Sequence, residues 1–267
     1  MLAKIINWAR RNFERVSIKL LGTSSLPILR LLSGYEILSI VDSNGCYELN
    51  GRSGEKLYIS RLVRLPKYRS GISKRLFNLQ QDYLTSTLQI PRDECVIDIG
   101  ANIGEFGLFW KSKNYKIYSF EPDPVEFDAL SENLIDHSIY NFGLWNSTTT
   151  LTFYCANDSG DSSLIRPASF KSEVKLDVYK LDEIEISGPI GLIKLEAEGA
   201  EPEILEGAIN TLRKTRYVTV DVGEERGVSG ESTLVDVCNF MFANGFGLMD
   251  FNPKRLVVLF TNLNLSN

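Results

Sequence analysis

The chain has 267 residues and a formal net charge of −5, with 43% hydrophobic and 24% charged residues. This composition is typical of a globular protein with one large core or two modest ones, and the negative charge argues against nucleic acid as the main partner. Its cysteines lack metal-ligand spacing, which predicts reduced thiols in a cytoplasmic protein without a zinc site. They are Cys46, Cys95, Cys155 and Cys238.

Residues 1–21 predict a basic amphipathic helix. Apolar residues recur on one helical face, at Ile5, Ala9, Phe13, Val16 and Leu20. Basic residues occupy the opposite face, at Lys4, Arg11, Arg15 and Lys19. Because charges interrupt every apolar run, the segment resembles neither a secretory signal nor a membrane span, and no other stretch looks long enough to cross a bilayer. We expect the apolar face to pack on the protein; the alternative is peripheral contact with an anionic membrane, at its inner face.

Residues 34–65 predict a small antiparallel meander, because short alternating apolar runs are joined by Asn-Gly turns. A helix over Leu76–Leu88 follows the meander. We therefore expect two parts, residues 1–75 with the first helix and the meander, and residues 76–267 with the main domain.

The stretch Val96–Gly104 predicts a buried strand, a glycine turn and the start of a helix. Such a turn exposes backbone N–H groups and lets a ligand approach closely; a tight turn without a ligand is the alternative. The spacing Asp-x-Gly-x-x-x-Gly lacks the Gly-x-Gly-x-x-Gly of nicotinamide-binding proteins. The acid suits a cationic nucleoside without phosphates, such as S-adenosylmethionine (SAM). The candidate cofactor contacts are Asp98, Gly100, Ala101, Asn102 and Gly104.

A second acid, Glu121, lies 23 residues after Asp98, at the end of the next predicted strand. An acid in that position binds ribose hydroxyls in comparable folds, and the alternative is a cap on the following helix. Asn141 and Phe142 are candidate adenine contacts through the amide and the ring, with burial of Phe142 in the core as the alternative.

Strands and helices alternate beyond Glu121. The predicted strands are Ile139–Trp145, Thr150–Tyr154, Val174–Tyr179, Ile190–Leu195 and Tyr217–Val222, and one helix runs from Pro202 to about Arg213. Phe246–Phe251 and Leu256–Phe260 form a terminal antiparallel pair. The pattern predicts a Rossmann-like α/β fold with a mostly parallel sheet, an antiparallel C-terminal edge and the N-terminal extension of helix and meander.

Four stretches, in this order, resemble the FkbM-type family of SAM-dependent methyltransferases. They are Val96–Gly104, Phe120–Pro122, Asp161–Leu164 together with Leu181–Ile184, and Ile193–Ala208. The resemblance covers residues 82–259. It implies a class I methyltransferase fold and O-methyl transfer, commonly to sugars or secondary metabolites.

Two positions depart from the family pattern. Glu196 stands where the family usually has Asp, and Asp221 stands where it often has Glu. Both residues keep the charge but shift its position. Methyl transfer is sensitive to such shifts, because a misplacement of about 1 Å can be costly.

The candidate catalytic residues are Lys194, Glu196 and Glu198, with Glu201 in support. In an extended chain the first three share one side. Two carboxylates so close would repel, so that one could hold a proton and act as a general base. Alternatively they could bind a divalent metal ion, or the acids could decorate a helix N-terminus.

We therefore expect a SAM-dependent O-methyltransferase that acts on a hydroxyl group of a sugar, glycan or related small molecule, during surface-glycan assembly. A non-catalytic SAM-binding or glycan-binding module is the alternative. A nicotinamide-dependent dehydrogenase is disfavoured, because this sequence lacks the Gly-x-Gly-x-x-Gly motif of such enzymes. His137, the single histidine, is expected to be a solvated helix-end residue rather than a base.

Overall fold

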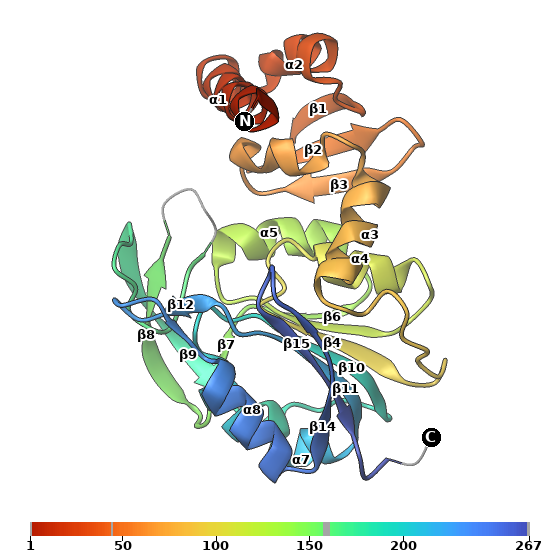
Figure 1. The fold of residues 1–267 in the computed structure, drawn as a ribbon, viewed down its shortest axis with the longest axis vertical. Coiled ribbons are helices and arrows are strands. Elements are labelled where there is room, and N and C mark those ends of the chain that lie inside the picture. Colours follow the sequence, from red (N-terminus) through yellow and green to blue (C-terminus); the bar gives the residue numbers. More distant parts are fainter. Residues whose placement is uncertain (1, 44, 157–160, 266–267) are drawn as a thin grey trace. The chain divides into compact units, whose positions relative to one another are not determined.

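The computed structural model describes residues 2–43, 45–156 and 161–265. The chain divides into two compact units, Met1–Asn78 and Leu79–Asn267, called here the first and second unit (Figure 1). The boundary falls within helix α3 (Ile72–Asp82). Each unit has its own sheet and its own buried apolar side chains.

In the first unit, helices precede a three-stranded antiparallel sheet in the order β1-β2-β3. The elements are α1 (Leu2–Leu21), the 3-10 helix η1 (Gly22–Ser25), α2 (Leu26–Ser33), β1 (Ile37–Ser43), β2 (Cys46–Gly51), β3 (Lys56–Ile59) and the 3-10 helix η2 (Leu62–Tyr68). Leu57 and Ile59 alternate onto one buried face of β3, and Leu49 is paired with Leu57 on the neighbouring strand. These contacts bury one face of the meander.

Helix α1 turns a different face inward from the one the sequence predicts. Among residues 5–21 the buried side chains are Glu14, Ser17 and Ile18, and Glu14 lies 3.8 Å from Arg10 and 3.9 Å from Arg69. The exposed fractions along the apolar stripe are 55% for Ile5, 38% for Phe13, 55% for Val16 and 75% for Leu20. The expectation that this stripe packs on the protein is therefore wrong, because an ion-paired polar face makes that contact instead.

One helical stretch of the described chain, Ile5–Ser33, is long and apolar enough to cross a membrane, judged by length and composition alone. The expectation that no stretch reaches this length is therefore wrong, because α1, η1 and α2 follow one another without a gap and so form one long helical stretch. Gly22, with a φ of +54°, separates α1 from η1 and α2 inside this stretch.

The second unit is built on a seven-stranded sheet in the order β14-β15-β11-β10-β4-β5-β6 (Figure 1). Six strands run parallel, and β15 runs antiparallel between β11 and β14. The strands are β4 (Cys95–Ile99), β5 (Ile117–Phe120), β6 (Ser138–Tyr140), β10 (Ile190–Leu195), β11 (Thr215–Asp221), β14 (Phe246–Asn252) and β15 (Val257–Asn262). The helices are α4 (Glu105–Lys111), α5 (Pro124–Asn133), α6 (Glu201–Glu206), α7 (Ile209–Arg213) and α8 (Leu234–Ala243).

Both faces of this sheet are covered. Strands β4 and β10 are buried along their whole length, as expected for apolar strands in a parallel sheet. Ile97 belongs to a core cluster that includes residues of α6, α7 and α8, whereas Val96 belongs to a cluster that includes residues of α4 and α5. The predicted Rossmann-like α/β fold is confirmed.

Three details differ from the sequence-based expectation. The helix expected over Leu76–Leu88 begins and ends earlier, as α3 (Ile72–Asp82). The predicted strand Ile139–Trp145 is divided between β6 in the main sheet and β7 (Gly143–Leu144), which joins β9 (Ser172–Tyr179) and β8 (Thr149–Cys155) in a separate sheet. The predicted helix from Pro202 is divided into α6 and α7. The remaining short elements are the 3-10 helix η3 (Leu181–Glu183) and the hairpin β12 (Glu224–Arg226) and β13 (Glu231–Ser232).

Candidate functional site

The strand order of the main sheet reverses between β4 and β10. The chain leads from β4 to β5 on one side and from β10 to β11 on the other. Ligands of open α/β sheets bind in the crevice at such a point, beyond the carboxyl ends of the strands. The glycine turn, residues 100–104, lies there after β4. The N–H groups of Gly100 and Ala101 both donate to the carbonyl of Phe120 at 3.0 Å, which ties the turn to β5.

The two glycines of the turn are required by the protein itself. Gly100 has a φ of +68°, and a Cβ there would lie 1.7 Å from the backbone oxygen of Glu196. A Cβ on Gly104 would lie 2.8 Å from Cδ1 of Leu130 in α5. The glycines thus allow close packing of β10 and α5, and only their backbone is left to face a ligand.

Glu121, at the end of β5, reaches back to the glycine turn. Its Oε2 accepts the N–H of Asn102 at 2.7 Å, and its Oε1 accepts the N–H of Asp123 at 2.8 Å. Burial raises the pKa of Glu121 to about 8, against the opposing effect of these two bonds. Asp123 caps α5 through the N–H of Val125 at 2.9 Å, so the capping function belongs to Asp123. Each oxygen of Glu121 keeps a further acceptor position.

The candidate adenine contacts are partly engaged within the chain. The amide of Asn141 donates to the backbone carbonyls of Glu121 at 2.9 Å and Pro122 at 3.3 Å. Phe142 is half-buried in an aromatic cluster with Phe120, Tyr140 and Tyr179. Phe142 therefore packs within the protein by part of its surface, and its contact with adenine stays a prediction.

Lys194 in β10 is only 2% exposed and lies at the centre of the crevice. Its ammonium group is 3.2 Å from Oδ1 of Asp98 and 3.2 Å from Oε2 of Glu196. It also donates to the carbonyls of Ile99 at 3.2 Å and Gly100 at 2.7 Å. Burial acts to lower the pKa of Lys194, but the two carboxylates raise it above its ordinary value. Lys194 therefore stays charged and fixes the start of the glycine turn, rather than accepting a proton.

Arg255 and Tyr83 complete the site, and sequence reasoning missed both. Arg255 precedes β15, and its guanidinium lies 2.6 Å from Oε1 of Glu196 and 3.3 Å from Oδ2 of Asp221. The Lys194 and Arg255 cations each lie 5.5 Å from the centre of the Tyr83 ring. The result is an alternating charge network, defined as Asp98, Lys194, Glu196, Arg255 and Asp221.

The carboxyl groups of Glu196 and Glu198, two of the candidate catalytic residues, have pKa values shifted in opposite directions. Burial acts to raise the pKa of Glu196, but Lys194 and Arg255 lower it to about 2. Burial, Glu225 and Glu196 together raise the pKa of Glu198 to about 10. The pKa of the neighbouring Glu225 is raised as well, to about 8, so Glu198 and Glu225 together retain a proton, whereas Glu196 is ionised and paired with two cations.

Glu198 is held in an unusual backbone conformation with a φ of +53°. The adjacent Glu201, only 1% exposed, accepts the N–H groups of Ala197 at 2.8 Å and Gly199 at 3.2 Å. Its second oxygen accepts the hydroxyl of Thr233 at 3.2 Å, and burial raises its pKa to about 7. Glu201 therefore supports the loop that presents Glu198.

In the described ranges of the chain, no group of three or more His, Cys, Asp or Glu side chains is arranged to hold a metal ion. Nδ1 of half-buried His137 accepts the N–H of Ile117 at 3.4 Å, at the start of β5 and hence at the opposite end of that strand from Glu121. All four cysteines lie in described parts of the chain, and none of them forms a disulfide.

The strand order, with β15 reversed, the glycine turn at the switch point and the buried acid after the next strand together define the class I fold of SAM-dependent methyltransferases. Residues 98–248 match the model of the methyltransferase FkbM domain. The chain belongs to this family.

Curated relatives carry the same assignment. The chain is 26% identical to the hexuronic acid methyltransferase AglP of Haloferax volcanii, over 54% of this chain and 62% of that protein. It is 30% identical to the methyltransferase sdnD of Sordaria araneosa, over 59% of this chain and 76% of the relative. It is 26% identical to the 2-O-methyltransferase NoeI of Sinorhizobium fredii, over 67% of this chain and 84% of that protein. The match to AglP thus spans less than two thirds of that relative.

Among solved structures, the magnesium protoporphyrin IX methyltransferase of Synechocystis PCC 6803 with bound SAM aligns with a TM-score of 0.44 and 9% identity, over 95% of this chain and 97% of that chain. This similarity is too low to transfer any residue role. The strand order and the family match carry the assignment.

Proposed function

We propose that this protein transfers the methyl group of SAM to a hydroxyl group of a sugar, glycan or related small molecule. The observation that carries the proposal is the glycine turn at the switch point, which packs against the backbone of Glu196 and is bound by the buried acid Glu121. Glu198, whose pKa is raised to about 10, lies two residues after Glu196 in the loop that follows β10. The names of two relatives, a hexuronic acid methyltransferase and a 2-O-methyltransferase, support a sugar hydroxyl as the acceptor.

The residues of the crevice suit SAM. This cofactor carries an ammonium and a sulfonium group and no phosphate, and in the crevice the acids Asp98, Glu121, Glu196 and Asp221 outnumber the cations Lys194 and Arg255. In the proposal, the free acceptor positions of Glu121 bind the ribose hydroxyls, and the backbone of residues 100–104 lies against the rest of the cofactor. When bound, SAM supplies an activated methyl group.

The protein must remove the hydroxyl proton of the acceptor. We assign this role to a carboxylate oxygen of Glu198. A carboxylate with such a high pKa is a strong base once ionised, and a cationic ligand beside it favours the ionised form. Glu196 remains paired with Lys194 and Arg255 and keeps the loop and the glycine turn in place.

A non-catalytic SAM-binding or glycan-binding module is the second candidate. It is favoured by the pairing of Glu196 with two cations, which occupies the acid that the family motif places in the site. Such a module would bind SAM or its product without turnover.

The test is a single-turnover assay with SAM labelled in its methyl group and a panel of hexuronic acid and hexose glycosides, with product mapping by mass spectrometry. The proposal expects label on one hydroxyl of at least one glycoside. S-adenosylhomocysteine (SAH) binding with no transfer to any glycoside would favour the module. Labelling of nitrogen or carbon in preference to hydroxyl oxygen would contradict the O-methyl assignment.

A further inference from the structure

The two units of the chain carry opposite charges. Residues 1–78 contain 14 Lys and Arg residues and 5 Asp and Glu residues, a net charge of +9. Residues 79–267 contain 15 Lys and Arg residues and 29 Asp and Glu residues, a net charge of −14. Such an asymmetry indicates that the basic unit has an anionic partner. The overall charge of −5 hides it.

Helix α1 shows the solvent an apolar sector beside a basic one. The apolar sector consists of the exposed stripe that includes Val16 and Leu20. At about 100° per residue, the basic sector of Arg11, Arg15 and Lys19 is centred roughly 120° around the helix from the centre of the apolar stripe. Within the described part of the chain, no hydrogen bond or ion pair engages these three basic side chains. Trp8, on the same side, is 70% exposed.

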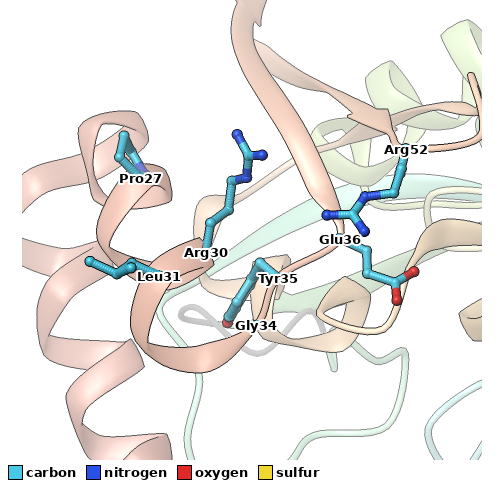
Figure 2. A pocket seen from close by; sticks show the side chains of 7 residues that line it. All are labelled: Pro27, Arg30, Leu31, Gly34, Tyr35, Glu36 and Arg52. Atoms are coloured by element: carbon cyan, nitrogen blue, oxygen red, sulfur yellow. The ribbon is translucent and has the colours of Figure 1, made fainter.

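The exposed apolar surface continues onto α2 and into an open cleft. Leu31 and Leu32 are 83% and 65% exposed. A cleft of about 540 Å³ lies beside Leu31, lined by Pro27, Arg30, Leu31, Gly34, Tyr35, Glu36 and Arg52. Figure 2 shows Arg30 and Arg52 reaching over this cleft from α2 and from the turn after β2, while the carboxylate of Glu36 points away.

We propose that this membrane-docking surface, defined as the exposed faces of α1 and α2 together with the cleft, binds an anionic phospholipid bilayer. Apolar side chains flanked by basic ones are what an interfacial helix requires, because the former enter the acyl boundary and the latter attract anionic headgroups. The planar guanidinium groups of Arg30 and Arg52 suit a lipid phosphate. The proposal does not rest on the enzymatic function.

The chain lies on the bilayer rather than crossing it. The turn at Gly22 divides the apolar stretch, and α1 carries Arg11 and Arg15 along its length. A protein partner would need only the apolar sector for binding. It would not account for the basic sector of α1 or for Arg30 and Arg52 at the cleft. A leaflet that faces the cytoplasm carries the required negative charge.

The first experiment is flotation of the full chain with vesicles of phosphatidylcholine, with and without phosphatidylglycerol. We expect flotation only with phosphatidylglycerol, weakened by added salt. Trp8 fluorescence is expected to shift to shorter wavelength on binding, because Trp8 is 70% exposed whereas Trp110 is buried and Trp145 is partly buried in the core of the second unit. The variant Trp8→Phe is expected to lose most of this shift while the protein still floats.

Matched variants locate the surface. Replacing Arg11, Arg15 and Lys19 together by Gln is expected to lower the partition coefficient roughly a hundred-fold, at about five-fold per charge. Replacing Val16, Leu20 and Leu31 together by Ser is expected to abolish flotation. The control replaces three exposed basic residues of the second unit by Gln and is expected to float like the parent. These are Lys113, Lys171 and Arg213.

Several results would overturn the proposal. One is the absence of flotation with vesicles that contain phosphatidylglycerol, and another is an equal loss of flotation in the control variant. A third is retention in the membrane after alkaline extraction, because that result marks a spanning segment. Dimerisation through the apolar sector without flotation would make a second copy of the chain the occupant. SAH binding, measured on every variant, reports folding of the second unit, so that failure here is distinguishable from failure of the enzymatic proposal.

Discussion

At the scale of residues, the site depends on one buried ammonium group. Lys194 touches two carboxylates and two backbone carbonyls, and it connects β4 with the residues that follow β10. Removing one partner of a buried charge pair leaves the other uncompensated, which costs more than the pair contributes. Lys194 therefore stabilises the fold and the cofactor site together.

Lys194→Met is expected to lower the free energy of unfolding by about 3–5 kcal/mol, because Asp98 is left buried and unpaired. Adding Asp98→Asn should recover part of this loss. Denaturant unfolding of the two single variants and the double variant measures the coupling. The control, Lys171→Met, changes an exposed lysine and should cost less than about 0.5 kcal/mol. Equal costs for the two lysines would contradict this account.

Glu198→Gln is expected to lower turnover by about two to four powers of ten while SAH still binds, because the proton acceptor is lost and the side-chain volume is kept. The parent enzyme should gain activity as the pH rises through the neutral range, since the pKa of Glu198 is about 10. The control is Glu185→Gln, which changes an exposed acid before β10 and hence at the opposite edge of the sheet. A variant at position 198 within a few-fold of the parent would remove Glu198 from the mechanism.

At the scale of elements, the glycine turn is held from three sides. The carbonyl of Phe120 accepts two of its N–H groups, Glu121 accepts a third, and Lys194 binds two carbonyls at its start. The backbone that follows β10 lies so close that Gly100 has no room for a side chain. The turn is therefore rigid before any ligand arrives.

Gly100→Ala should destabilise the second unit far more than Gly188→Ala and should abolish SAH binding. Both glycines have positive φ, +68° and +84°, so both variants incur about 1–2 kcal/mol of backbone strain. Only Gly100 adds a clash, at 1.7 Å from Glu196, whereas the nearest atom at Gly188 is 3.8 Å away. Thermal unfolding and calorimetry with SAH measure the difference. Similar melting temperatures for the two variants would refute the packing argument.

Sequence patterns predicted those elements in which one local signal dominates. The apolar strand Val96–Ile99 and the glycines after it specify β4 and its turn without reference to the rest of the chain. The two-residue strand β7 has no such signal, because its pairing with β9 depends on residues more than thirty positions away.

Helix α1 and the charge network show a second limit. The spacing of Ile5 to Leu20 reveals an apolar face but not the surface that this face meets, and the structure turns it outward. Arg255 and Tyr83 lie outside every motif and reach the site only because β15 and the end of α3 are placed there by the fold. Long-range charge pairs of this kind leave no pattern in a single sequence.

At the scale of the whole molecule, buried acids make stability depend on pH. Burial raises the pKa of Glu121 to about 8 and that of Glu201 to about 7. Between their ordinary pKa and these values, the native state keeps protons that the unfolded chain has lost, so stability falls as the pH rises. Glu196 acts in the opposite sense, because its pKa of about 2 adds stability that is lost only in acid.

The melting temperature is therefore expected to be highest near about pH 5 and to decline towards about pH 8. Glu201→Gln should flatten this decline, because it removes one titrating group and keeps the acceptor for the N–H groups of Ala197 and Gly199. Scanning fluorimetry across this range provides the measurement. A melting temperature that climbs from about pH 5 to pH 8 would be incompatible with these shifts.

The central claim is that the crevice between β4 and β10 is a SAM site. Calorimetric titration of the intact protein with SAM, SAH and NAD tests it most directly, with Glu121→Leu as the variant and Glu185→Leu as its control. The account predicts one site for SAM and SAH, lost in Glu121→Leu, retained in Glu185→Leu, and no binding of NAD. Binding of NAD in preference to SAH, or SAH binding unchanged in Glu121→Leu, would contradict it.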